Sequence, residues 1–404
     1  MVSRMEEYGW KPMVLTVTDA AVVRSGGLQD PLEGKVGAVL RVVDPLAAVQ
    51  KSGGIITAPS SDGQGGLKAR LVAIAKTFLF PDRTIFWAWK LRGASHAIQK
   101  MAPDIIISTS PSLASHFAAR RLARKCGAKW IAEFRDPASW LPKHDGTSQF
   151  KRNLLKNMER SIVESADAII TVSDAFSKYF RSQYPAAPIY TVPNGSNFDE
   201  AMIARNVAAR KKRMAEQSSD SPLILVHAGA LYGGARDPAP LIAAAQVAAK
   251  QIERRILLRF IGDDSYLAAD AAKKLGAEHL VEAIGALGHA ETVAETEQAD
   301  ALLALLHNDP VARISIMSKF FDYVATANPV LVVGERQAML SRIVEDDRAG
   351  TVREYSDIEG MAAWIAELAE KPETFSYDPL PICKKWSADE MAKKMAALLN
   401  SLVV

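Results

Sequence analysis

Two segments in the second half of the chain carry side chains suited to bind a diphosphate. The first is residues 229–237, which include Arg236 and lie between an apolar run and a helix expected to begin at Pro238. Its other candidate residues are Gly229, Tyr232, Gly233 and Gly234. Glycines let a backbone approach a ligand, an arginine supplies a permanent cation, and amides at a helix start favour an anion. The alternative is a glycine-rich turn with a solvated arginine.

The second segment has Lys319 and Asp322 at the start of an expected helix. A spacing of three residues puts both side chains on one helix face. A cation there can reach a phosphate, and a carboxylate can accept both hydroxyls of a ribose. Together with Arg236, the two residues would surround the diphosphate and ribose of a nucleotide. The alternative is a solvated ion pair on the helix surface.

Short apolar runs alternate with helical apolar spacing, which indicates an α/β fold built from βαβ units with parallel sheets. The expected strands of the first half are 13–17, 105–108, 129–134, 168–173 and 189–192. Those of the second half are 223–228, 256–261, 280–284, 301–306 and 330–333. Expected helices include Pro238–Gln251, Lys319–Ala327 and Ala388–Leu399. Ligands bind at the carboxyl ends of such strands.

The length of 404 residues favours two domains. We expect two Rossmann-like, doubly wound domains that face a central cleft. The first covers residues 1–200, and the second covers 223–385. A polar and basic segment, 201–222, is expected to link them, and residues 386–404 contain a last helix that follows the second sheet.

Five landmarks in chain order resemble the retaining nucleotide-sugar glycosyltransferases of the GT-B fold, also called glycosyltransferase family 4 or glycosyl transferases group 1. They are FRDP (134–137), ADAIITVS (166–173), PNGSNFD (193–199), GALYGGARDP (229–238) and SKFFDYVATANPVLVVG (318–334). The resemblance spans nearly the whole chain. It implies that the last helix crosses back to the first domain and that Asn194 and Gly195 form the hinge.

The resemblance also implies roles for single residues. It places a phosphate-binding basic residue in the 229–238 segment, which is Arg236 here. The strand ends that bear Gly262, Asp263 and Gly288 would lodge the nucleotide base. The family carries two glutamates, of which Asp322 replaces the second and Ile314 stands in place of the first.

In the first half, Arg135 and Asp136 occupy a strand end where many relatives have a histidine near the transferred sugar. Asp136 is the candidate to orient the acceptor hydroxyl or the sugar, and Arg135 to pair with a carboxylate or phosphate. A structural Arg–Asp pair before Pro137 is the alternative. His116 is expected to pack on a helix face rather than to act in catalysis.

A further expectation concerns the start of the chain. Residues 8–17, YGWKPMVLTV, resemble the end of the first helix of the family and the strand after it. Met1 would then lie inside that helix, so the family's first strand and its glycine-bearing loop would be missing from the N-terminal domain. A glycosyltransferase lacking them could have lost its activity.

Composition excludes several classes of protein. Cys126 and Cys383 are the only cysteines, so neither a disulfide framework nor a four-cysteine zinc site is available. No apolar run reaches the roughly 18 residues that span a bilayer. We therefore expect a cytoplasmic protein without metal or cofactor, and the absence of D-x-D also argues against a metal-dependent transferase.

The net charge of +3 conceals an asymmetry, because residues 51–135 hold 14 basic and 4 acidic residues. Basic residues alternate with apolar ones at 68–80, and Arg120, Arg121, Arg124 and Lys125 follow on a helix. Such a surface favours contact with an anionic membrane, with a solvated face as the alternative. No nucleic-acid motif is present.

The sequence thus predicts a hexosyltransferase-type glycosyltransferase at the inner face of the cytoplasmic membrane. It would transfer a sugar from a nucleotide-diphosphate sugar to a saccharide or lipid-linked acceptor, with retention of configuration, in cell-surface or exopolysaccharide synthesis. The alternatives are a nucleotide-sugar epimerase of the same fold and a non-catalytic GT-B-like binding protein.

Overall fold

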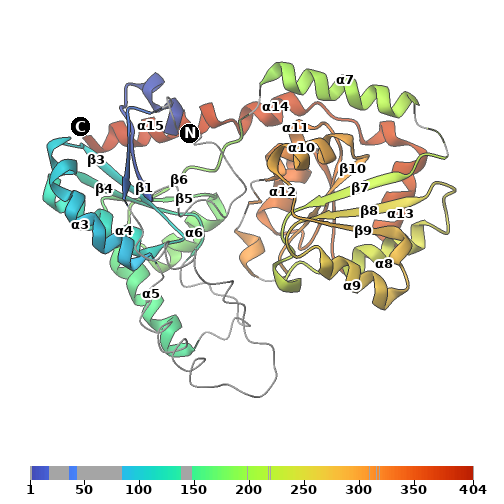
Figure 1. The fold of residues 1–404 in the computed structure, drawn as a ribbon, viewed down its shortest axis with the longest axis horizontal. Helices are drawn as coiled ribbons and strands as arrows, with labels where there is room; N and C mark the ends of the chain where they lie inside the picture. The colour runs from blue at the N-terminus through green and yellow to red at the C-terminus, as the bar shows by residue number, and fades with distance from the viewer. Residues whose placement is uncertain are drawn as a thin grey trace. The chain divides into compact units, whose positions relative to one another are not determined.

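The computed structural model describes residues 2–17, 36–42, 84–137, 148–197, 199–216, 218, 220–308, 310–314, 316–317 and 319–403 (Figure 1). The chain divides into two compact units. The first unit comprises Met1–Val192 and Ala392–Val404, and the second comprises Pro193–Met391. The basic stretch 68–80 lies outside the described residues.

The first unit has parallel strands throughout its described part. A two-stranded sheet pairs β1 (Met13–Val17) with β2 (Ala38–Val42). A second sheet has the order β3-β4-β5-β6, with bounds Ile105–Thr109, Lys129–Phe134, Ala168–Thr171 and Ile189–Thr191. The helices are η1 (Val2–Tyr8), α3 (Ile85–Lys100), α4 (Leu113–Cys126), α5 (Gln149–Val163) and α6 (Asp174–Gln183).

Local sequence explains where these helices begin and end. The Ser112 hydroxyl accepts a hydrogen bond from the Ser115 amide at the start of α4, and the left-handed Gly127 ends that helix. The Ser173 hydroxyl caps α6 through the Phe176 amide. Each cap follows a strand of the second sheet, so the chain turns at the carboxyl end of that sheet.

The last helix, α15 (Ala388–Val403), contributes to the core of the first unit. Its buried face includes Met395 and Leu399, which belong to one apolar cluster with Ile131 and Ile170 of β4 and β5. The Trp10 indole also donates a hydrogen bond of 3.0 Å to the Asn400 side chain. The C-terminal residues therefore complete a core that begins near the N-terminus.

The second unit holds a six-stranded parallel sheet of order β12-β11-β10-β7-β8-β9. From β7 to β12 the bounds are Leu223–Ala228, Ile256–Ile261, Val281–Gly285, Ala301–Leu305, Val330–Val333 and Gly350–Arg353. The strands run in chain order outward from β7 on one side and from β10 on the other. This is the doubly wound Rossmann order, in which β7 and β10 flank the point where the strand order reverses.

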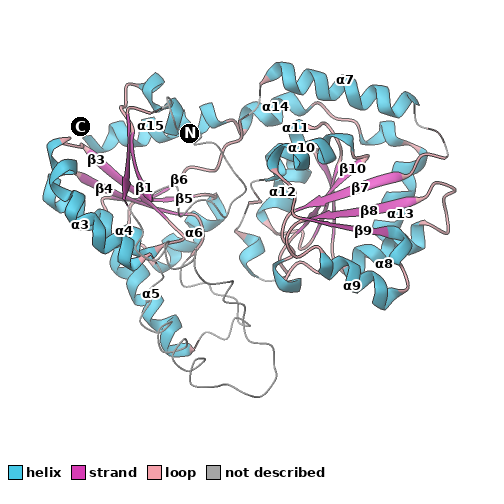
Figure 2. Cartoon of the chain, in the orientation of Figure 1, coloured by secondary structure: helices cyan, strands magenta, loops and turns pink. Residues whose placement is uncertain are grey.

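Helices cover both faces of this sheet (Figure 2). Their bounds are α7 Glu200–Glu216, η3 Tyr232–Gly234, α8 Ala239–Ala248, α9 Tyr266–Leu275, η4 Glu278–Leu280, α10 His289–Gln298, η5 Pro310–Arg313, α11 Lys319–Ala325, α12 Met339–Asp346, α13 Ile358–Glu370, η6 Pro372–Phe375 and α14 Pro379–Lys385. One core contains residues of α8, α9 and α13, and the other contains residues of α7, α11, α12 and α14. Alternate residues of β7 supply them, with Leu225 on the first face and Val226 on the second.

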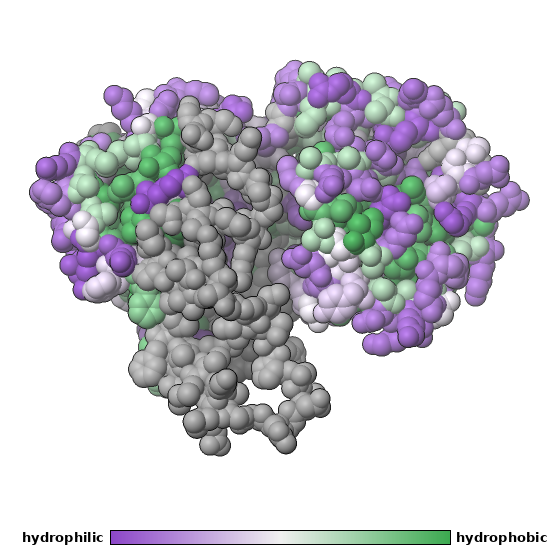
Figure 3. All heavy atoms as spheres, viewed as in Figure 1, coloured by the Kyte–Doolittle hydropathy of each residue, from purple (hydrophilic) through white to green (hydrophobic). Residues whose placement is uncertain are grey.

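The segment 201–222, expected to link two domains, lies within the second unit. Most of it is α7, which contacts α11 and α14 and buries Ile203 in their core. In Figure 3, purple hydrophilic residues mix with pale, weakly apolar ones on the outer surface of α7. The polar composition of this segment therefore reflects a helix with one buried face.

The expected strands are confirmed to within two residues at their ends. Two strands were not predicted. β12, with sequence GTVR, begins at Gly350, and a side chain there would meet the Val330 carbonyl oxygen. β2 (AVLRV) pairs only with β1 among the described strands. Both lie at the edge of a sheet, where the apolar signal of a buried strand is weak.

Candidate functional site

The candidate site lies at the carboxyl ends of β7 and β10, where the strand order reverses. The two strands pair only at Ala301–Leu225 and Leu302–Val226, whereas β7 and β8 stay paired up to Ala228. Beyond Val226, β7 and β10 therefore no longer form a ladder. Open α/β sheets bind ligands at such a point.

The glycine-rich loop begins at Gly229, directly after β7. The loop backbone has positive φ angles at Tyr232 (52°), Gly233 (64°) and Gly234 (94°), a conformation that suits glycine. Gly262, at the end of β8, is needed for a different reason. A β-carbon there would lie 2.5 Å from the Gly229 carbonyl oxygen. The glycines thus shape the loop and allow its close contact with β8.

Most amides of this loop donate to protein atoms. The Asp264 carboxylate accepts from the amides of Leu231 (2.8 Å) and Gly233 (3.3 Å). The Ala239 amide, at the start of α8, donates to Asp237. These contacts differ from the expectation that loop amides and the helix start face a ligand. Side chains, rather than these amides, are left to bind an anion.

Three side-chain nitrogens converge beside Gly229. A methyl group built on this glycine would lie 3.7 Å from His227 Nε2, 3.8 Å from Arg236 Nη1 and 3.9 Å from Lys319 Nζ. Arg236 stacks on the Tyr232 ring at 4.6 Å and donates to the Ala230 carbonyl at 3.2 Å. Its Nε is buried and has no hydrogen-bond partner among the described residues.

The charges of this cluster are poorly compensated. Burial, and then the Arg236 guanidinium, lowers the pKa of Lys319 below its usual range. Burial also lowers the pKa of Arg236. The Asp322 carboxylate acts in the opposite direction on Lys319 but does not restore its pKa. A bound anion would relieve the repulsion between the two cations, so the geometry and the electrostatics both favour an anionic ligand.

Lys319 and Asp322 lie in the first turn of α11, as the spacing predicts. Asp322 accepts a hydrogen bond of 2.8 Å from the Ser196 hydroxyl. The next residue, Tyr323, is buried and holds the end of β7, because its hydroxyl accepts from the Ala228 amide and donates to the Ala228 carbonyl. Ile314 is buried. The structure therefore brings Arg236, Lys319 and Asp322 together.

Other predicted residues do not contact this cluster. Asp263 is exposed, and it is its neighbour Asp264 that holds the loop. Gly288 begins α10, where its amide donates to the Glu291 carboxylate at 2.9 Å. Sequence reasoning missed His227, Asp264 and Tyr323. The available signal was their position at or beside the ends of apolar runs.

The predicted residues of the first unit lie at the end of β4. Arg135 and Asp136 are both exposed, and the Arg135 amide donates to the Ser110 hydroxyl at 2.7 Å. His116 is fully buried, bonds through Nδ1 to Ser108 and stacks on the Phe134 ring at 4.8 Å. The expectation that His116 packs on a helix face is confirmed.

Asn194 and Gly195, predicted as a hinge, open the second unit. The φ angle of Gly195 is not positive, so the residue does not serve an unusual turn. A β-carbon there would lie 2.7 Å from the Ser387 carbonyl oxygen. Ser196 pairs with this segment as an isolated bridge. Glycine is required for this close approach.

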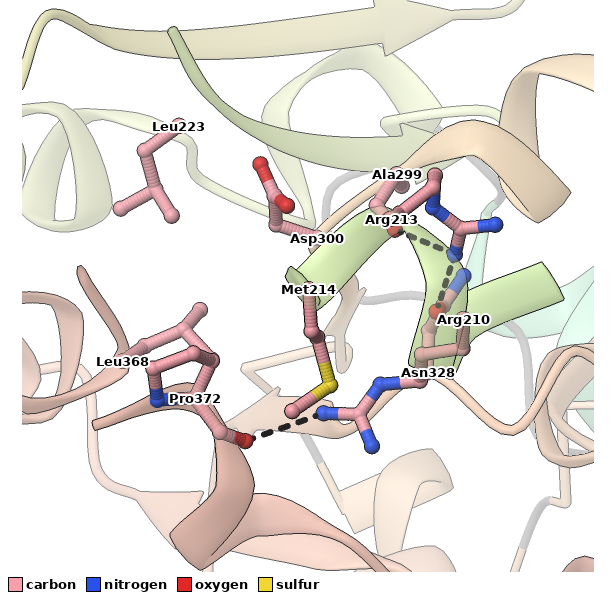
Figure 4. Close-up of a pocket in the computed structure, with 9 residues that line it drawn as sticks. All are labelled: Arg210, Arg213, Met214, Leu223, Ala299, Asp300, Asn328, Leu368 and Pro372. Carbon is pink, nitrogen blue, oxygen red and sulfur yellow. Dashed lines mark hydrogen bonds between the residues drawn. The ribbon is translucent and has the colours of Figure 1, made fainter. Parts of the chain in front are cut away.

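A cavity lies at the opposite end of the second sheet, and its two lining arginines form hydrogen bonds with other parts of the second unit (Figure 4). Arg210 of α7 donates to the Ser376 hydroxyl and the Pro372 carbonyl. Arg213 donates to the Ala299 carbonyl and to Asn328. These bonds satisfy groups at helix ends and fix α7 to the sheet, so this cavity is a weaker candidate for ligand binding.

The described residues include no cluster of three or more His, Cys, Asp or Glu side chains able to hold a metal ion. Likewise, no helix in the described ranges has the length and apolarity to cross a bilayer.

Comparisons with known proteins agree with this architecture. Residues 11–195 match the family model of the glycosyl transferase 4-like domain. No curated protein sequence matches the chain. Sucrose-phosphate synthase from Thermosynechococcus elongatus is similar in structure, with a TM-score of 0.61, 16% identity, and coverage of 99% of this chain and 91% of that one.

Two further solved structures are similar. Anabaena Alr3699/HepE in complex with UDP and glucose has a TM-score of 0.58 and 15% identity, covering 96% of this chain and 99% of that one. A glycosyltransferase from Rickettsia africae has a TM-score of 0.60 and 11% identity, covering 100% and 93%. The chain has the GT-B fold, and its predicted resemblance to GT-B glycosyltransferases is confirmed.

Proposed function

We propose that this chain, a GT-B protein with a glycosyl transferase 4-like N-terminal domain, transfers a sugar from a nucleotide-diphosphate sugar to a saccharide or lipid-linked acceptor. The observation that carries the proposal is the convergence of Arg236 and Lys319 beside Gly229, at the reversal point of the second sheet. HepE, whose fold is similar, forms a complex with UDP and glucose, so uridine nucleotides are the first donors to test.

In the proposed reaction, the bond between the sugar C1 and the diphosphate oxygen breaks, and a bond from C1 to the acceptor oxygen forms. The acceptor proton passes to the leaving diphosphate, whose own oxygen assists on the same face and so retains configuration. Arg236 and Lys319 stabilise the negative charge that develops on the diphosphate. Asp322 holds the ribose hydroxyls, and Arg135 and Asp136 orient the sugar or acceptor.

The first test is binding of nucleoside diphosphates. Thermal shift with UDP, GDP, ADP, CDP and dTDP identifies the base, and calorimetry then measures the dissociation constant. Arg236→Ala and Lys319→Ala should each weaken binding about tenfold or more, because each loses a charge-assisted contact. Lys250→Ala is the matched control, since Lys250 is exposed and precedes β8 at the opposite end of the sheet. Unchanged affinity in both site variants would refute the site.

The second test distinguishes a transferase from an epimerase and from a non-catalytic binding protein of the same fold. The donor is incubated with and without a mixture of saccharide acceptors, and the products are followed by mass spectrometry. A transferase yields a glycosylated acceptor, whereas an epimerase converts the donor without one. Ile314, buried where the family has a glutamate, favours a non-catalytic binding protein as second candidate. Nucleotide binding with no turnover across acceptors would support that candidate.

We also propose that the first unit contacts an anionic membrane. Helices α3 and α4 pack together and carry seven basic residues and no acidic ones, namely Lys90, Arg92, Lys100, Arg120, Arg121, Arg124 and Lys125. α3 exposes Phe86 (41%) and Trp89 (58%). Aromatic rings favour the interface of a bilayer, and each basic residue near an anionic surface contributes about 1 kcal/mol. A cytoplasmic protein would meet such lipids at the inner face of the membrane.

Sedimentation with lipid vesicles tests this contact. The protein should bind vesicles that contain phosphatidylserine and not those of phosphatidylcholine alone, and salt should weaken the binding. Trp89→Ser should reduce binding, whereas Tyr266→Ser, which changes an aromatic residue of similar exposure (59%) in the second unit, should not. Equal sedimentation with both vesicle types would contradict the proposal.

A further inference from the structure

His227 is a buried titratable residue to which no role has yet been assigned. It is the penultimate residue of β7 and has no solvent exposure. Its Nδ1 lies 2.9 Å from the Leu303 carbonyl oxygen on β10, in the stretch where the two strands no longer pair. A carbonyl oxygen can only accept, so Nδ1 carries the hydrogen of the neutral ring. Nε2 is then left with a lone pair.

This Nε2 has no hydrogen-bond partner among the described residues. Buried polar atoms are seldom left unpaired, and exceptions call for an explanation. Nε2 belongs to the three nitrogens that converge beside Gly229, the other two being those of Arg236 and Lys319. The atom therefore faces the space proposed for the diphosphate.

The charged groups that act on His227 lie in the loop after β7, on α11 and in the turn after β8. The Arg236 and Lys319 cations disfavour a proton on the ring, and the Asp264 carboxylate favours it. Phe260 of β8 contacts the ring with centroids 5.8 Å apart. Burial first, and then Arg236 and Lys319, lowers the pKa of His227 to about 4. Without a bound anion, the ring is therefore neutral at physiological pH.

We infer that His227 takes up a proton at Nε2 when a nucleoside diphosphate binds, and donates it in a hydrogen bond to a phosphate oxygen. This inference rests on the proposed donor site. The proton comes from solvent and returns there on release, so no other bond forms or breaks. A neutral Nε2 would turn a lone pair toward phosphate lone pairs, whereas the imidazolium makes a charge-assisted bond. An anion at this distance raises the pKa of a histidine.

His227 would thus be a donor-binding residue that couples donor binding to proton uptake. Two substitutions separate its nitrogens. His227→Asn places an amide near Nδ1, which keeps a donor for the Leu303 carbonyl, and removes Nε2. His227→Gln places an amide near Nε2, where it is a donor at every pH. Neither variant can take up a proton at this position.

Calorimetry with the nucleoside diphosphate that binds best tests the inference. Titrations at about pH 6, 7 and 8, in buffers of different ionisation enthalpy, give the number of protons taken up. The ligand's own terminal phosphate titrates near pH 6. Its contribution cancels when a variant is subtracted from the wild type. The wild type should take up more protons than either variant, and its affinity should increase more steeply as the pH falls, by at most tenfold per unit.

Equal proton uptake in wild type and both variants would overturn the inference and leave the proposed donor site intact. Weaker binding in His227→Asn without a difference in proton uptake would also overturn it, because Nε2 would then act as an acceptor for a ligand hydroxyl. If the wild type binds no nucleoside diphosphate, the proposed function fails and this inference fails with it. Thermal unfolding of both variants establishes that they fold.

Discussion

The contact between Gly262 and Gly229 offers a direct test of how the donor loop is positioned. Gly262→Ala introduces one methyl group at a residue whose φ angle suits any amino acid. The new β-carbon would lie 2.5 Å from the Gly229 carbonyl oxygen and 3.0 Å from its carbon. Both backbones are fixed by hydrogen bonds, from Gly229 to Ile261 and from Gly262 to Gly285, each 2.8 Å long. The strain therefore cannot be relieved by a side-chain rotation.

An ordinary contact of about 3.4 Å requires the two backbones to separate by about 0.9 Å. Forcing extra atoms into a packed region costs about 1–3 kcal/mol of stability. The displaced residue is Gly229, around which the Arg236, Lys319 and His227 nitrogens converge. Misplacement by about 1 Å can cost about 100-fold in rate. We expect nucleoside diphosphate binding to weaken by about 10- to 100-fold.

Gly276→Ala is the matched control for stability. Gly276 ends α9 with φ at +64° and has no atom within 4 Å of a built β-carbon, so its cost of about 1–2 kcal/mol is conformational and remote from the site. Both variants should unfold at lower temperature, measured by circular dichroism, but only Gly262→Ala should lose affinity in calorimetry. Equal affinity in Gly262→Ala and Gly276→Ala would show that the loop position does not control binding.

Three further outcomes follow from the same unit. Asp264→Ala removes the acceptor of the Leu231 and Gly233 amides, so these amides should exchange hydrogen faster and affinity should fall about tenfold; unchanged exchange contradicts this. Lys319→Met should raise the free energy of unfolding of the ligand-free protein at neutral pH, because a lowered pKa means that folding disfavours the charged form of Lys319. This increase in stability should shrink as the pH approaches 10.5, where the lysine loses its proton in both states. Arg210→Met should lower the free energy of unfolding by about 1–3 kcal/mol with affinity unchanged, since its bonds are structural.

The interior of the fold could be predicted because parallel strands are buried on both faces and so appear as continuous apolar runs. β7, β8 and β11 have the predicted bounds for this reason. β12 was missed because it contains Gly350 and Arg353 and lies at a sheet edge. The polar composition of residues 201–222 suggested a linker, but most of them form α7, a helix that buries only a few side chains.

The candidate site was predictable in part. Spacing placed Lys319 and Asp322 on one helix turn, and the glycine-rich segment indicated a loop with Arg236. Composition could not distinguish Asp263 from Asp264, because only the turn after β8 decides which carboxylate reaches the loop amides. The sequence indicated only that His227 lies within an apolar strand. Its role emerges only from the separation of β7 and β10, which is a property of tertiary structure.

The hydrogen bond between Ser196 and Asp322 bears on the proposed ribose contact. Asp322 Oδ1 already accepts from the Ser196 hydroxyl at 2.8 Å. A carboxylate has about four acceptor positions on two oxygens, so two ribose hydroxyls can still be accommodated. The Ser196 contact would hold the carboxylate in one orientation before the ligand arrives. Ser196→Ala should then weaken binding modestly, by less than Asp322→Ala.

A comparison of ligands can isolate this contact without assigning the whole loss of affinity to one residue. Replacing the ribose of the bound nucleoside diphosphate with 2′-deoxyribose should cost the wild type about 1.5–3 kcal/mol, the value of a hydrogen bond to a charged group, or about 10- to 150-fold. In Asp322→Ala the two ligands should bind almost equally, because the acceptor is gone. Asp270→Ala, which removes an exposed carboxylate of α9, should keep the full difference. If the difference in affinity between the two ligands persists in Asp322→Ala, another group binds the ribose hydroxyl, and the Asp322 carboxylate acts only on Lys319.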